Sequence, residues 1–66
     1  MNILILDEEV YLAQKVAMRL QEEGNNCTHV SNIKEIDFKT EYDAILLSTN
    51  ISSSDVQKII KHFKYF

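Results

Sequence analysis

Two short segments rich in apolar side chains constrain the fold of this chain more than any other feature. Residues 2–6 read Asn-Ile-Leu-Ile-Leu, and residues 42–47 read Tyr-Asp-Ala-Ile-Leu-Leu. Apolar runs that are this short and do not alternate with polar residues are typical of strands covered on both faces. Such strands occur in parallel sheets flanked by helices, so the two runs predict an α/β fold.

A clear helical repeat lies between the two runs. Its apolar side chains are spaced so that they share one side of a helix: Leu12, Ala13, Val16, Ala17 and Leu20. Polar residues fill the other side, so the repeat predicts an amphipathic helix over residues 10–23: Gln14, Lys15, Arg19, Gln21 and Glu22. Gly24 follows directly, and glycine in that place favours a left-handed cap that ends the helix.

The middle of the chain is less clearly patterned. Residues 25–30 fit a weaker strand, and residues 31–40 fit a short, irregular helix through Ile33, Ile36 and Phe38. With these two segments included, the chain reads strand, helix, strand, helix, strand up to residue 47.

The last part of the chain carries a helix start signal. Ser52 and Asp55 form a Ser-x-x-Asp pattern, in which the serine accepts hydrogen bonds from free backbone N–H groups. A helix is therefore predicted over residues 55–63, with one apolar face: Val56, Ile59, Ile60 and Phe63. Strands that alternate with helices in this way imply right-handed crossovers and a mainly parallel sheet with helices on both faces.

Parallel sheets of this kind carry their chemistry at the carboxyl ends of the strands. The polar residues expected there follow the two apolar runs: Asp7, Glu8, Ser48, Thr49 and Asn50. Two adjacent carboxylates suit a hard cation such as Mg²⁺ or Mn²⁺. A structural role stays open, because acids in the first turn of a helix also stabilise it through its dipole.

The segments described above resemble the receiver domains of two-component response regulators. Residues 3–9, Ile-Leu-Ile-Leu-Asp-Glu-Glu, resemble the opening of such domains, where a hydrophobic strand ends in an acidic pair. Residues 42–47 resemble the third strand of the family, and residues 20–24 resemble the close of its first helix. The resemblance covers essentially all of residues 1–66. It implies a flavodoxin-like half-domain with three parallel strands in the order 2-1-3 and three helices.

The resemblance also implies roles for individual residues. Asp7 and Glu8 match the acidic pair that holds Mg²⁺, and Asn50 falls where the family contributes a backbone carbonyl to the metal. Ser48 falls where the family has the aspartate that accepts phosphate from a histidine kinase. A serine hydroxyl is a poor nucleophile at neutral pH unless a base activates it. Losing a carboxylate also weakens metal binding, so a weak or vestigial Mg²⁺ site and no catalytic residue are expected.

The family continues with two further strands, which add a hydroxyl residue and a lysine to the site. On this comparison, residues 1–66 are interpreted as a truncated receiver-like domain. Its third strand would pair on one side only, and a free apolar edge of that kind recruits another chain. A homodimer is expected, formed edge to edge or by exchange of elements about a two-fold axis.

The composition excludes several other classes of protein. The net charge of -3 and the pI near 5.2 argue against direct contact with nucleic acid, which normally requires a basic face. No apolar run approaches the roughly 20 residues that cross a membrane. Cys27 is the single cysteine, so an internal disulfide is impossible and a cytoplasmic location is expected.

These observations favour a degenerate receiver module in two-component signal transduction rather than an enzyme. In this interpretation it regulates transcription through dimerisation or other protein contacts, without aspartate phosphorylation. Its expected partners are a second copy, a histidine kinase or an attached output domain. Two alternatives stay open, namely a Mg²⁺-dependent phosphoacceptor receiver and a structural fragment that folds only as a dimer.

Overall fold

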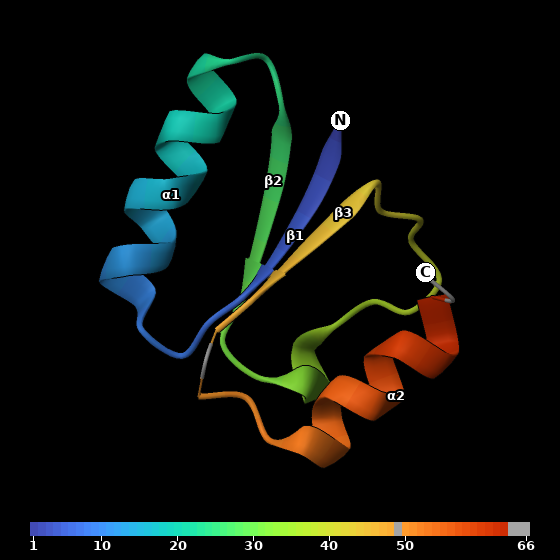
Figure 1. Ribbon diagram of the computed structural model, residues 1–66. Helices are drawn as coiled ribbons and strands as arrows, with labels where there is room; N and C mark the ends of the chain where they lie inside the picture. The colour runs from blue at the N-terminus through green and yellow to red at the C-terminus, as the bar shows by residue number, and fades with distance from the viewer. Residues whose placement is uncertain (49, 64–66) are drawn as a thin grey trace.

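The computed structural model describes residues 1–48 and 50–63 and shows a parallel sheet with one helix on each face (Figure 1). The elements, in chain order, are β1 (Asn2–Leu6), α1 (Val10–Glu22), β2 (Asn26–Val30), the 3-10 turn η1 (Ile33–Glu35), β3 (Ala44–Leu47) and α2 (Ser53–Phe63). The three strands lie in the order β2-β1-β3, and both pairings are parallel. The predicted α/β class and strand order are therefore confirmed.

The central strand β1 explains why its sequence is an unbroken apolar run. Ile3 and Ile5 point to the face covered by α1, where they pack against Ala13. Leu4 and Leu6 point to the opposite face and pack in a cluster with Ile59 of α2. Because alternate side chains of a strand point to opposite faces, cover on both sides buries all four of these apolar residues.

The helix α1 packs through the small side chains of its predicted stripe. Ala13 is buried, and Ala17 and Leu20 pack beside it, whereas Leu12 is 50% exposed and Val16 is 43% exposed. Small residues allow a helix to approach a sheet closely, so the line of contact follows the alanines. Leu12 and Val16 are left at the margin of this contact.

The predicted end of α1 is confirmed. Gly24 has φ +92°, a conformation that costs a residue with a side chain about 1–2 kcal/mol. Its N–H donates to the carbonyl of Gln21, and the N–H of Asn25 donates to the carbonyl of Leu20. These bonds close the helix and turn the chain directly into β2.

The predicted middle helix is wrong, so the described residues contain two α-helices instead of three. Between β2 and β3 the chain forms only the 3-10 turn η1. The side chain of Asn32 accepts from the N–H of Lys34, and that of Asp37 accepts from the N–H of Lys39. Such local bonds compete with a continuous helix. The apolar residues that suggested a helix pack under α2 instead: Ile33, Ile36 and Phe38.

The strand β3 is shorter than predicted and α2 is longer. Residues 42 and 43 precede β3, although Tyr42 is buried in the α2-side cluster. The helix α2 starts at Ser53, two residues before the predicted start at 55. The predicted cap is confirmed, because Ser52 Oγ accepts from the N–H of Asp55 at 3.3 Å.

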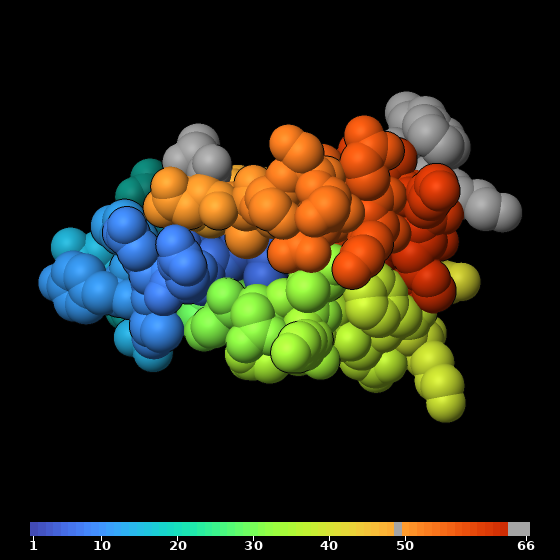
Figure 2. Space-filling model, turned by 90° about the horizontal axis from the view of Figure 1, so that it is seen from below, coloured from blue at the N-terminus to red at the C-terminus, as the bar shows by residue number. Residues whose placement is uncertain are grey.

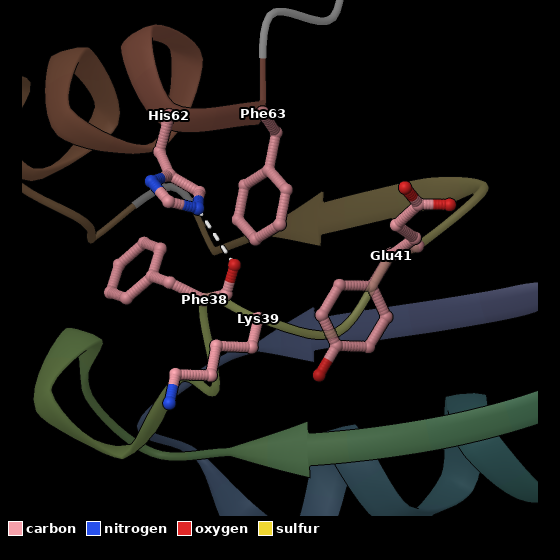
Figure 3. Close-up of a pocket in the computed structure, with 6 residues that line it drawn as sticks. Phe38, Lys39, Glu41, His62 and Phe63 are labelled. Carbon is pink, nitrogen blue, oxygen red and sulfur yellow. Dashed lines mark hydrogen bonds between the residues drawn. The ribbon is translucent and has the colours of Figure 1, made fainter.

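The far end of α2 is held by aromatic contacts with the loop before β3 (Figure 3). The ring of Phe38 stacks on Phe63 with centroids 5.7 Å apart, and His62 Nε2 is hydrogen-bonded to the carbonyl oxygen of Phe38 at 2.7 Å. These contacts fix α2 against the sheet. Neither described α-helix has the length and apolar character needed to span a bilayer.

Candidate functional site at the carboxyl ends of the strands

The parallel sheet brings two predicted site residues to one rim. Leu6 of β1 and Leu47 of β3 are neighbours in the register, so the residues that follow them, Asp7 and Ser48, leave the sheet side by side. The N–H of Ser48 donates to the carbonyl of Leu6 at 2.9 Å. Asp7 and Ser48 also line one cavity of about 190 Å³ together with residues of α1, β1 and β3. The predicted juxtaposition of Asp7 and Ser48 is confirmed.

Figure 2 views the molecule from the side of this rim. The start of α1 (blue), the segment after β2 (green) and the segment after β3 (orange) surround the strand ends. Atoms of β1 (dark blue) are visible between them. The site is therefore built from three chain segments that lie far apart in sequence.

Asp7 has a structural task at this rim. Its Oδ1 accepts a hydrogen bond from the N–H of Glu9 at 2.9 Å, just before the first turn of α1. Its own N–H donates to the carbonyl of Val30 at 3.1 Å. Asp7 thus holds the turn between β1 and α1 and ties it to the end of β2. This role differs from the helix-dipole role left open by the sequence, because the first turn of α1 contains no acid.

His29 is a rim residue that the sequence pattern did not single out. Its Nε2 lies 2.8 Å from the carbonyl oxygen of Asp7, and its side chain is partly buried. It reaches this position because β2 runs parallel to β1 and ends at the same rim. The only sequence signal was its place next to the end of the predicted second strand.

Ser48 is partly buried, and its side chain is used in a turn. Its Oγ accepts a hydrogen bond from the N–H of Asn50 at 3.2 Å, and its carbonyl accepts from the N–H of Ile51 at 3.2 Å. Within residues 1–48 and 50–63, no carboxylate or imidazole accepts a hydrogen bond from this hydroxyl group. Activation of a serine nucleophile requires such a base.

Two further predicted site residues, Glu8 and Asn50, follow the same strand ends at the surface. Glu8 and Asn50 are exposed, and Thr49 lies outside the described residues. In the described part of the chain, no three His, Cys, Asp or Glu side chains are grouped so that they could hold a metal ion. The assignment of Asp7, Glu8 and Asn50 to Mg²⁺ therefore stays a prediction.

A second, larger cavity of about 370 Å³ lies at the far end of α2 (Figure 3). Its lining includes Phe38, Tyr42 and Phe63, which contact one another ring to ring, with the exposed side chains of Lys39 and Glu41 at its margin. It adjoins the segment that leads into β3, so it lies at the end of the sheet opposite the rim. Phe38 and Tyr42 both contact the ring of Phe63, so these aromatic residues serve to pack the end of α2.

The rim thus combines two acids, a hydroxyl group and an imidazole on a parallel sheet. This arrangement can attract a cation or hydrogen-bond a partner, but it contains no activated nucleophile among the described residues. Comparisons of the chain with protein-family models, curated proteins and solved structures found no match.

Proposed function

We propose that this chain is a degenerate receiver module of a two-component system, located in the cytoplasm, that acts through protein contacts. The observation that carries the proposal is the shared rim, where Asp7 ends β1 and Ser48 ends the neighbouring parallel strand β3. The flavodoxin-like receiver has its acidic pair and its phosphoacceptor at these two strand ends. Control of transcription through an attached or partner output domain is part of the same proposal.

The chemistry of Ser48 supports a module that is not phosphorylated in the usual way. An aspartate accepts a phosphoryl group as a carboxylate, with a metal ion neutralising the developing charge. Ser48 provides a hydroxyl whose oxygen already accepts from the N–H of Asn50. Replacing a carboxylate by a hydroxyl also removes a ligand and a negative charge from the cation site, so Mg²⁺ binding is expected to be weak.

A phosphorylation assay on the full chain tests the proposal. The chain is incubated with acetyl phosphate or beryllofluoride in the presence of Mg²⁺, and its mass and amide NMR spectrum are recorded. We expect no added phosphate and no Mg²⁺-dependent shift at the rim. The physical reason is that no base among the described residues activates the hydroxyl group of Ser48.

The matched variant is Ser48→Asp, which restores a carboxylate at the same place. We expect it to show Mg²⁺-dependent amide shifts at Asp7 and Glu8 that the unaltered chain lacks. A phosphorylated native chain whose added mass disappears in Ser48→Ala would contradict the proposal and favour a working phosphoacceptor.

A further inference from the structure

The sheet has two edge strands, β2 and β3, and only β3 is entirely apolar. In the described residues, β3 is hydrogen-bonded to β1 alone, so its other side is free. The strand Ala44–Leu47 has no charged residue and no proline, which are the usual means of blocking an edge. Its last two side chains are well exposed, with Leu46 at 40% and Leu47 at 37%.

The apolar surface continues from this edge onto α1. The helix α1 packs mainly on β2 and β1; of β3, Ala44 packs against the α1-side cluster, whereas Leu46 is 40% exposed. Leu46 of β3 and Val16 and Ala13 of α1 all line the 190 Å³ cavity. Leu12, 50% exposed, lies one helical turn from Val16. The exposed surface is therefore a strand edge with an apolar groove beside it.

The direction of the free backbone groups follows from the bonds that are made. The N–H of Ser48 points to β1, where it donates to Leu6. Backbone groups alternate sides along a strand, so the N–H and C=O of Leu46 also point to β1. Those of Ile45 and Leu47 point outward. The edge therefore presents two donors and two acceptors in a row.

We propose that a second copy of this chain occupies the edge, with the two β3 strands antiparallel about a two-fold axis through Leu46. A two-fold axis perpendicular to the sheet keeps each α1 on the same face and makes the two strands antiparallel. In this register Ile45 of each copy exchanges hydrogen bonds with Leu47 of the other. All four outward groups of each strand are then paired, which no other symmetric register within β3 achieves.

The side chains suit the same register. The two copies of Leu46 lie opposite each other in a non-hydrogen-bonded pair, where side chains approach most closely. Both lie on the α1 face, beside the groove, and so cover each other. Because the two-fold axis uses the β3 edge of both copies, this contact closes as a dimer, and the outer edges of the joined sheet are the two β2 strands with their polar side chains.

Charge and size set the expected strength of the dimer. Each chain carries a net charge of -3, but the nearest acid to the edge, Asp43, has its Oδ2 bonded to the N–H of Asn2 at 2.7 Å. Pairing four-residue strands buries less than the roughly 1,200–2,000 Å² of a standard interface, so we expect a weak dimer with Kd of about 10–500 µM. The dimer itself is inferred from the structure. Only its role, as a partner contact of the receiver module, rests on the proposed function.

Sedimentation velocity tests the dimer. The protein concentration is varied from roughly 5 µM to roughly 1 mM, a range that includes the expected Kd. The unaltered chain is expected to pass from monomer to dimer and to go no further. Leu46→Lys places two like charges at the axis and should weaken dimerisation about tenfold or more. The control Thr28→Lys adds the same charge to an exposed site on the β2 edge and should leave dimerisation unchanged.

The strand register of the dimer is tested by mixing oppositely charged variants and by disulfide cross-linking. A mixture of Leu46→Lys and Leu46→Glu should form a heterodimer that neither variant forms alone. In a Cys27→Ser background, Leu46→Cys should form an interchain disulfide under mild oxidation, whereas Ala44→Cys should not.

A chain that stays monomeric at the highest concentration, open-ended growth, or no rescue in the mixture would each overturn the proposal. Circular dichroism of each variant verifies that the fold is kept. Since none of these variants changes Asp7 or Ser48, their outcome is separate from that of the phosphorylation assay.

Discussion

The two edges of the sheet flank the same central strand, yet they present different surfaces. Val30 of β2 and Leu47 of β3 both lie beside Leu6 in the register, but Val30 is 6% exposed and Leu47 is 37% exposed. The outer residues of β2 include the exposed polar side chains of Asn26 and Thr28. Val30 packs with Leu6 and Ile59 in the cluster on the α2 face, whereas Leu47 belongs to neither core cluster. Burial of an apolar residue thus depends on how far the neighbouring layer extends over its strand.

The largest expected difference between the two edges is in the cost of removing apolar side chains. Val30→Ala deletes buried methyl groups and should lower the free energy of unfolding by about 2 kcal/mol. Leu47→Ala removes a larger side chain that is already partly in water, so we expect a loss below about 1 kcal/mol. Urea denaturation at low micromolar protein concentration measures both. Equal losses would show that the β3 edge is covered in solution.

The turn that leads into β2 provides the next comparison. Gly24→Ala places a side chain at φ +92° and should cost about 1–2 kcal/mol. Among the described residues, no atom beyond the two chain neighbours lies within 4 Å of the added Cβ, so the loss comes from the backbone conformation. The neighbouring Glu23→Ala, at φ -89°, is the control and should change stability by less than about 0.5 kcal/mol. A stable Gly24→Ala would mean that this turn can relax.

Substitutions in the loop that leads into β3 should have the smallest effect on the free energy of unfolding. The pKa of Asp37 is lowered below its ordinary value of 3.8, first by the hydrogen bond from the N–H of Lys39 and then by that from Thr40 Oγ1. A carboxyl group whose pKa is lower in the folded chain stabilises the fold above its unfolded pKa. This contribution is lost as the pH falls through the folded pKa.

NMR titration of the Asp37 carboxyl group should therefore give a midpoint below 3.8. Thr40→Val removes one hydrogen bond and should raise that midpoint, while Asp37→Asn should remove the associated pH dependence of stability. Because Asp37 is exposed, the change in stability should be small. A midpoint at or above 3.8 would show that the loop does not keep these bonds in solution.

The rim shows how far the sequence could predict the candidate site. Two apolar runs, each followed by polar residues, were enough to place Asp7 beside Ser48, because parallel strands end at the same rim. The contact between His29 and the carbonyl of Asp7 was not predictable in this way. It depends on the register of β2 and on side-chain direction, and neither leaves a pattern in the chain itself.

Local chemistry by itself determined the elements with strong signals: β1, the end of α1 at Gly24 and the cap of α2 at Ser52. In residues 31–40, local bonds to Asn32 and Asp37 leave only a 3-10 turn, and the tertiary structure decided that the apolar side chains of this loop pack under α2. It also decided that Ala13 is buried while Val16 and Leu46 face an open groove. The physical reason is that periodicity shows which side chains are apolar, whereas burial depends on where a neighbouring layer ends.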